Sequence, residues 1–371
     1  MGYLSALAIL PKFLWKSIFD YLSIKQLMKL SGLGAYNSIL TDSYCKELIY
    51  GDKSGAIIAV TTDHPRIDNF WRHACVAYNT YDCMKNLSLS LNKKTSESIH
   101  ISVFIKPGIY RTILDYYSHH SFNNSKYSLS INGSKLRKTK FRCTDLYNIN
   151  YVNLPQCFSL KNIVFTSNVI IDGSYSRNNI TKSINLVNCI FNGLSLSLTE
   201  HVTLAGCIFK VATRLTSIQH LSISKCEFGG IFSLQKIYRS VITKCLFNSV
   251  PIKLDGKTGG SIDFCNNTVI YARSIFRITH IENNTIDIHD NTISDIDTFI
   301  SFYKCSSKSK NNRFLVHNNH LENIRHKYNI IDSMHNIINV GKHAIDRINN
   351  GCKIIIDDTN TLTNCGFDTK N

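Results

Sequence analysis

The chain has 371 residues, of which 43% are hydrophobic and 18% charged, a composition that excludes a wholly disordered or collagen-like protein and allows two or three domains. Lysine and arginine outnumber aspartate and glutamate by 42 to 26, and the resulting net charge of +16 attracts nucleic acid, anionic lipid or an acidic protein. The apolar stretch 2–11 is too short to span a membrane and lacks the flanks of a secretory signal. We therefore expect no membrane partner and an intracellular protein, in the cytoplasm with the nucleus as an alternative.

Two further features of the sequence bear on which classes of partner the chain can bind. The densest basic run, 135–142, has no nucleic-acid-binding signature around it, so we interpret it as a solvated loop and regard nucleic acid as an unlikely partner. The chain has 13 cysteines but no C-x-x-C pair, which removes the common zinc and redox signatures. We expect reduced, buried thiols.

The first fifty residues have helical periodicity. Three apolar stripes follow one another at helical spacing: Leu10, Leu14, Ile18 and Leu22; then Leu27, Leu30 and Leu33; then Leu40, Tyr44 and Leu48. Pro11 suits the first turn of a helix. Because three short helices cannot bury three apolar faces by themselves, a partner or a neighbouring domain must cover the remainder.

This N-terminal segment resembles the F-box. The family pattern of an LP pair, an I-F-x-Y-L core and an L-x-x-L-S element is matched by Leu10-Pro11, 18–22 and 27–31, while Lys12 and Gln26 replace the usual acidic residues. The resemblance implies that 1–50 form an F-box-like helical domain that binds the Skp-type adaptor of a cullin ubiquitin ligase. The residues that it implies in this contact are Leu10, Pro11, Leu14, Ile18, Phe19, Leu22, Leu27 and Leu30. The alternative is an unrelated helical hairpin, which would also carry leucines at this spacing.

Residues 51–98 are expected to form a helical linker. Apolar residues at helical spacing from Ile67 to Tyr78, with Phe70 and Trp71 as core anchors, predict a fourth helix there.

From residue 99 the periodicity changes to that of short strands. Strict alternation predicts a strand over 99–105, ended by the turn Pro107-Gly108. A short unit of strand, cysteine and x-Phe then recurs, and its cysteines are 18, 19, 19 and 20 residues apart: Cys189, Cys207, Cys226, Cys245 and Cys265. A fixed period near twenty indicates a solenoid.

The repeat unit favours a right-handed parallel β-helix over 99–371, which makes the expected fold mainly β, preceded by a small all-α domain. In such a coil, equivalent residues stack about 4.8 Å apart, so we expect inward ladders of cysteine and of phenylalanine. One cysteine per coil, with no histidine at ligand spacing, favours buried stacking over a metal or disulfide ladder. Later coils carry Asp or Asn instead, at 286–291, 314–319 and 354–358, which predicts asparagine stacking.

Two short segments add a second resemblance. Residues 103–110 and 130–133 are similar to the V-x-P-G-x-Y and I-x-G elements of carbohydrate-binding and sugar-hydrolase β-helices. An F-box joined to this kind of β-helix is a known architecture of ubiquitin-ligase substrate receptors. With the richness in Asn, Ile, Lys and Tyr, the chain resembles F-box proteins of large DNA viruses, which implies the host cytoplasm.

A catalytic alternative rests on few acidic residues. Asp287, Asp290, Asp295 and Asp297 cluster in sequence with His289, and Asp357-Asp358 form a pair. We interpret them as solvated residues spread along one coil, whereas sugar chemistry requires a paired acid and base from several coils. The sequence therefore predicts no catalytic residues, no metal and no cofactor. It predicts an adaptor that captures an unknown target protein with an acidic or phosphorylated surface; the alternative is a glycan-binding or glycan-cleaving β-helix with a helical cap.

Overall fold

The computed structural model describes residues 47–51, 56–61, 99–105, 108–110, 127–133, 139–141, 147–150, 157–172, 183–256, 258–279, 281–303, 311–331, 337–338, 353–356 and 358–366. Every regular element in these ranges is a β-strand, so the described protein is mainly β. None of these ranges contains a helix long and apolar enough to cross a membrane. The helices expected within 11–33 and near 67–78 lie outside the described residues.

Contacts divide the chain into two compact units. The strands of unit 1 are β1 (Glu47–Gly51), β2 (Ala56–Thr61), β3 (Ile99–Ile105), β4 (Gly108–Tyr110), β5 (Tyr127–Asn132), β6 (Thr139–Phe141), β8 (Cys157–Lys161) and β9 (Ile163–Phe165). A further strand, β7 (Tyr147–Asn150), is divided between the two units. Within unit 1, β3, β5 and β8 pair in parallel, as do β4, β6 and β9. The strand predicted over 99–105 is confirmed as β3.

The first two strands of unit 1 correct part of the helical prediction. Leu48, which helical periodicity places on the third apolar stripe, lies in β1, and β1 pairs antiparallel with β2. β2 lies inside the segment expected as a helical linker, and its Ile57, Ile58 and Val60 are β-branched residues that favour an extended chain. Helical spacing alone was misleading at Leu48, because apolar residues four apart also fit an extended strand at alternate positions.

Unit 2 holds the longer series of strands. They are β10 (Asn168–Asp172), β11 (Ser183–Val187), β12 (Ile190–Ala205), β13 (Ile208–Ser224), β14 (Glu227–Phe228), β15 (Ile231–Thr243), β16 (Leu246–Asn248), β17 (Ile252–Asp255), β18 (Thr258–Cys265), β19 (Thr268–Ile270), β20 (Ser274–Thr279), β21 (Glu282–His289), β22 (Thr292–Tyr303), β23 (Arg313–His317), β24 (His320–Ile331), β25 (Ile337–Ile338), β26 (Lys353–Ile356) and β27 (Thr361–Thr363). Apart from the antiparallel pair β24–β25, the strand pairs described within this unit are parallel.

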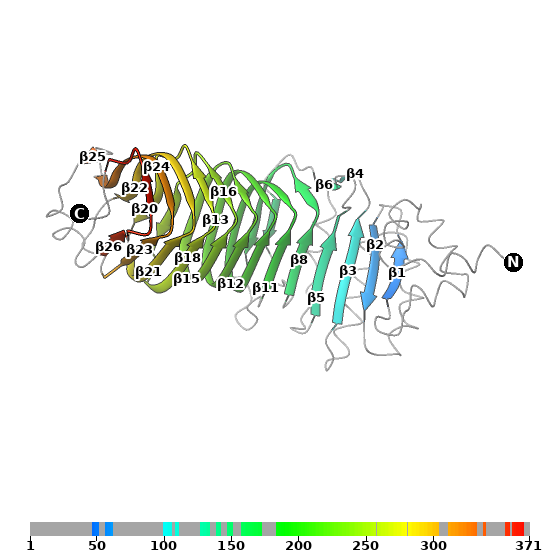
Figure 1. Cartoon of the computed structure of the whole chain (residues 1–371). Helices are drawn as coiled ribbons and strands as arrows, with labels where there is room; N and C mark the ends of the chain where they lie inside the picture. Colours follow the sequence, from blue (N-terminus) through cyan, green and yellow to red (C-terminus); the bar gives the residue numbers. More distant parts are fainter. Residues whose placement is uncertain are drawn as a thin grey trace. The chain divides into compact units, whose positions relative to one another are not determined.

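The parallel pairs of unit 2 stack coil upon coil. Sheet 1, our name for the sheet that later carries the candidate site, consists of β11, the C-terminal ends of β12, β13 and β15, and then β18, β21, β23 and β26. Figure 1 shows these strands side by side, each one coil further along the chain. Alternation along each strand turns one set of side chains into the interior and the other to the outside. The pairing therefore aligns residues that are about one repeat apart in sequence.

The phenylalanine of each repeat forms an interior ladder, as predicted. Phe191, Phe209, Phe228 and Phe247 are fully buried, and successive rings stack with centroids 5.5, 5.0 and 4.8 Å apart. Burial of each such ring stabilises the fold by about 2–3 kcal/mol relative to exposure. The centroid distances are close to the ~4.8 Å spacing of neighbouring strands, as stacking of like residues on paired strands requires.

The cysteine ladder is confirmed for four of the five cysteines. Cys189, Cys207, Cys226 and Cys245 are buried thiols that are not joined in disulfides, and the Cys226 thiol donates to the carbonyl of Leu204 one coil earlier. Hydrogen bonds with neighbouring thiols and burial raise the pKa of Cys207 and Cys245 above the ordinary range, so these two thiols are neutral.

Cys265 does not continue this ladder, contrary to the repeat prediction. Cys265 pairs in register with Thr243, whereas Asn267 occupies the interior position and its Oδ1 accepts a hydrogen bond from the backbone N–H of Cys245 at 2.9 Å. The connection between the two coils is longer than in the earlier repeats, so matching cysteine to cysteine misaligned the coil by two residues. Cys265 therefore lies before the corner residue Asn266, at an outward position of β18, and not at the interior position of the ladder.

Asparagines extend the ladder from this point, as expected for the later coils. Asn267, Asn291, Asn319 and Asn360 are buried, and each of the first three donates through both its backbone N–H and its Nδ2 to the next Oδ1 at 2.8–3.2 Å. In the last coil the ladder residue is Asn360; Asp358 is exposed, and Asp357 lies outside the described residues. The ladder satisfies buried polar groups at a corner where the backbone cannot do so by itself.

The residue immediately before each ladder cysteine adopts a left-handed backbone conformation. Lys225 and Lys244 precede Cys226 and Cys245 with φ of 55° and 56°, and Gly206 has the same conformation with φ of 63° before Cys207. This conformation is unfavourable for a lysine and free of strain for a glycine.

Candidate functional site

Polar side chains meet on the outer face of sheet 1 where β18, β21 and β23 lie side by side. Along β18, Ile262 and Phe264 are buried, so Asp263 between them projects outward. Strand pairing aligns Asp263 with Asp287 of β21. One outward position later, the pairing aligns Cys265 with His289 of β21, and His289 with His317 of β23. Three neighbouring strands thus contribute to one site.

The two histidines of this site are held by three carboxylates. His289 Nε2 lies 3.1 Å from Asp263 Oδ1, and its Nδ1 lies 2.7 Å from Asp290 Oδ2. His317 Nε2 lies 3.0 Å from Asp287 Oδ1, and the two imidazole rings stack with centroids 5.1 Å apart at an interplanar angle of 2°. The side chain of His289 is 24% exposed and that of Asp263 45%, whereas Cys265 is buried, so the site is open to the outside on the Asp263 side.

The surrounding charges favour the protonated form of His289. Burial lowers the pKa of this imidazole, but the hydrogen bond to Asp290 and the charges of Asp263 and Asp287 outweigh it, and the net pKa is raised. A positive charge on this imidazole is stabilised by the neighbouring carboxylates, which is the physical cause of the upward shift of its pKa.

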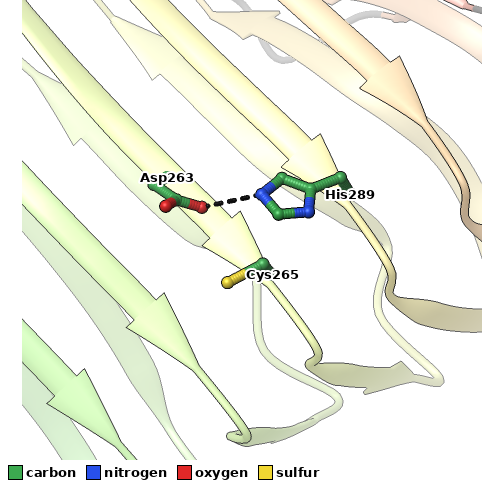
Figure 2. Close-up of side chains that lie close together, drawn as sticks. All are labelled: Asp263, Cys265 and His289. Carbon is green, nitrogen blue, oxygen red and sulfur yellow. Dashed lines mark hydrogen bonds and ion pairs between the residues drawn. The ribbon is translucent and has the colours of Figure 1, made fainter.

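Cys265 lies beside this pair. A carboxylate oxygen of Asp263, the sulfur of Cys265 and a ring nitrogen of His289 all lie within 4.8 Å of one another. Figure 2 shows the Asp263 carboxylate directed at the imidazole of His289, with Cys265 close by at the end of its strand. Burial raises the pKa of the Cys265 thiol, and the Asp263 charge adds to this. Because both ring nitrogens of His289 already have carboxylate partners, this arrangement does not activate Cys265 as a nucleophile.

The structure changes the sequence-based interpretation of the acidic residues. The expectation that Asp287 and His289 project outward is confirmed, and Asp287, Asp290, Asp295 and Asp297 do lie along one coil, in β21, β22 and the turn between them. The structure adds a carboxylate from the preceding coil. Asp263, which the clustering in sequence does not include, belongs to the site. Asp295 and Asp297 do not: Asp295 accepts a hydrogen bond from Asn323 at 2.9 Å, and Asp297 pairs with Arg325 at 3.3 Å.

A sequence signal for this site existed but required the correct repeat alignment. Asp263 and Asp287 are both followed at the second position by an outward residue and at the fourth by a ladder asparagine, as in Asp263-x-Cys265-x-Asn267. Aligning the ladder asparagines instead of the cysteines places Cys265 beside His289.

Sheet 1 also carries a basic row on its outer face. The strand pairing aligns four exposed basic side chains with two hydroxyl residues between them: His201, His220, Arg239, Ser261, Thr285 and Arg313. The rings of His201 and His220 stack with centroids 4.8 Å apart. Tyr238, beside Arg239, is 52% exposed, and Val241 is 44% exposed. This part of the face therefore combines positive charge with exposed apolar surface.

The residues predicted to contact a Skp-type adaptor, Leu10 to Leu30, lie outside the described residues, so the structure does not place them. No protein-family model, no curated protein and no solved structure matches the chain.

Proposed function

We propose that the chain is a substrate-recognition subunit of a Skp/cullin/F-box ubiquitin ligase. In this proposal, residues 1–50 form an F-box that binds the Skp-type subunit, and a right-handed parallel β-helix from residue 99 onward captures the target protein. The observation that carries the proposal is the order and spacing of Leu10-Pro11, 18–22 and 27–31, which follow the F-box pattern over two expected helices. The described parallel strands of unit 2 are compatible with the second half of this architecture.

The proposed mechanism is proximity. A target lysine held near a charged ubiquitin-conjugating enzyme reacts at a raised effective concentration, without any catalytic group supplied by this chain. The apolar stripes of 1–50 supply the anchors for helix-in-groove binding.

The outer face of sheet 1 supports the capture role. Tyrosine and arginine are the residue types that most often dominate protein interfaces, and here Tyr238 and Arg239 are exposed beside Val241. The basic row and the net charge of +16 favour a target with an acidic or phosphorylated surface.

The adaptor proposal is tested by copurification from cells of the full chain carrying Ile18→Asp and Leu22→Asp. We expect the wild type to retain a cullin complex and the double variant to lose it, because two charges would enter an apolar interface. Lys16→Asp is the matched control: it lies off the apolar stripe and also changes the net charge by two. An equal cullin yield from the double variant and the wild type would refute the F-box assignment.

A glycan-cleaving protein is the second candidate, and the aspartates of the outer face favour it. Asp263 and Asp287 occupy aligned positions on neighbouring strands, which lie about 4.8 Å apart, a spacing similar to the ~5 Å that separates the carboxyl groups of retaining glycosidases. Each aspartate is held by a histidine. Release of reducing sugar or unsaturated product from an acidic glycan by the wild type, abolished by Asp263→Asn with Asp287→Asn, would establish this candidate; no release would exclude it for the glycans tried.

A further inference from the structure

The side chains of Asp263, Cys265 and His289 provide three metal-ligand types within one small space. Their donor atoms all lie within 4.8 Å of one another, and Asp263 Oδ1 lies 3.1 Å from His289 Nε2. A tetrahedral zinc ion holds sulfur at ~2.3 Å and nitrogen or oxygen at ~2.0–2.2 Å, so its ligand atoms lie about 3.3–3.7 Å from each other. The upper limit of 4.8 Å exceeds that separation by about 1.1–1.5 Å, so the side chains have to rotate to close on an ion.

We propose that Asp263, Cys265 and His289 form a Zn²⁺ site on the outer face of sheet 1. This inference is independent of the adaptor function, and it replaces the expectation that the chain binds no metal.

The backbone fixes two of the three ligands relative to each other. Cys265 and His289 are paired residues of adjacent parallel strands, and their neighbours Phe264 and Ile288 are buried in the interior. Ligands on strands of a packed core are held more firmly than ligands on loops, so little order has to be gained when the ion binds.

Asp290 orients the ligand imidazole. Its Oδ2 lies 2.7 Å from His289 Nδ1, which leaves Nε2 directed toward Asp263 and the space where the ion would lie. A carboxylate on the second ring nitrogen is the arrangement that commonly fixes the ring orientation and raises the basicity of a zinc-bound histidine. Asp290 is therefore a positioning residue of the site.

The mixed donor set selects the metal. A thiolate with an imidazole and a carboxylate suits zinc, whereas magnesium and calcium prefer oxygen ligands alone. The ion takes the place of the proton on the Cys265 sulfur and of any proton on His289 Nε2, which are released to solvent, and it replaces the contact between His289 Nε2 and Asp263 Oδ1. With three protein ligands and an open side, shown by the 45% exposure of Asp263, a tetrahedral ion has its fourth position available for water or for a donor group of a bound partner.

The test is metal binding by the purified full chain. After removal of metals with a chelator, titration with Co²⁺ followed by absorption reports thiolate ligation, and competition by Zn²⁺ gives the zinc affinity. We expect one equivalent of Co²⁺ with a thiolate-to-cobalt band, loss of that band in Cys265→Ser, and its retention in Cys365→Ser, a half-exposed control thiol. No band in the wild type, or a band that Cys265→Ser leaves unchanged, would overturn the proposal.

Two further measurements separate ligation from a folding defect. His289→Gln is expected to weaken zinc affinity by more than about a hundredfold, and Asp290→Asn by about tenfold through the loss of ring orientation. In the wild type, Zn²⁺ should lower the alkylation rate of Cys265, which is buried and is therefore followed over hours by mass spectrometry, without lowering that of Cys365. The same measurable alkylation rate of Cys265 with and without zinc would contradict the site even if every variant failed to fold.

Discussion

Replacing Asn291 by alanine removes an interior link of the asparagine ladder. Its Oδ1 accepts hydrogen bonds from the backbone N–H of Asn267 at 2.8 Å and from Asn267 Nδ2 at 3.2 Å. Its Nδ2 donates to the carbonyl of Phe264 at 2.8 Å and to Asn319 Oδ1 at 2.9 Å. All four contacts are lost in Asn291→Ala, and they connect three successive coils.

The magnitude follows from these four contacts. A hydrogen bond contributes about 1 kcal/mol net, and a buried group left without a partner costs about 1–3 kcal/mol. The partners of Asn291 are themselves buried at this corner, so we expect Asn291→Ala to lower the free energy of unfolding by about 3–5 kcal/mol. Asn291→Cys should cost less, because Cys245 fills the equivalent position two coils earlier and its sulfur both donates and accepts.

Urea unfolding of the full chain, followed by far-ultraviolet circular dichroism, measures this free energy. The matched control is Thr292→Ala, which truncates the next residue on the exposed side and is expected to change stability by less than about 0.5 kcal/mol. A loss below about 1 kcal/mol for Asn291→Ala would refute the view that the ladder stabilises the coils.

Three other predictions concern the coils and the outer face. Cys226→Ala should cost about 1–2 kcal/mol for a small cavity, whereas Cys226→Asp should unfold neighbouring coils, because it buries an unpaired charge; similar urea midpoints for the two would argue against an interior position. Lys225→Gly should raise stability by about 0.5–1 kcal/mol, since Lys225 has a φ of 55° where the previous coil uses Gly206, and a lower midpoint would count against this. Arg239→Gln with Arg313→Gln should weaken capture of the target and flatten its salt dependence; unchanged binding at low salt would remove the basic row from the interface.

Repetition is the property that made much of the coil stack predictable from sequence. Cys189 and Phe191 recur in one order at nearly one period, so their stacking followed from the parallel pairing of like residues. The strand over 99–105 was equally easy to predict, because alternating apolar residues give a strand one apolar face. The cysteine-ladder prediction failed at Cys265, because the repeat length changes there. The helix prediction failed at Leu48, because its spacing from the other apolar residues fits both a helix and a strand.

The candidate site was less predictable, because strand pairing creates it from residues far apart in the sequence. Asp263 and His289 are 26 residues apart, and His317 and Asp287 are 30 apart. Neither pair forms a local motif, and only the register of β18, β21 and β23 brings them together. The F-box assignment rests on a local pattern and stays a prediction, because its residues lie outside the described ranges.

The most direct test of the adaptor function is the affinity of the purified full chain for a purified Skp-type subunit, measured by isothermal titration calorimetry. We predict one-to-one binding with a Kd of about 1 µM or tighter, weakened more than about a hundredfold by Ile18→Asp with Leu22→Asp and little changed by Lys16→Asp. No heat of binding from the folded wild type at concentrations up to about 100 µM would contradict the account.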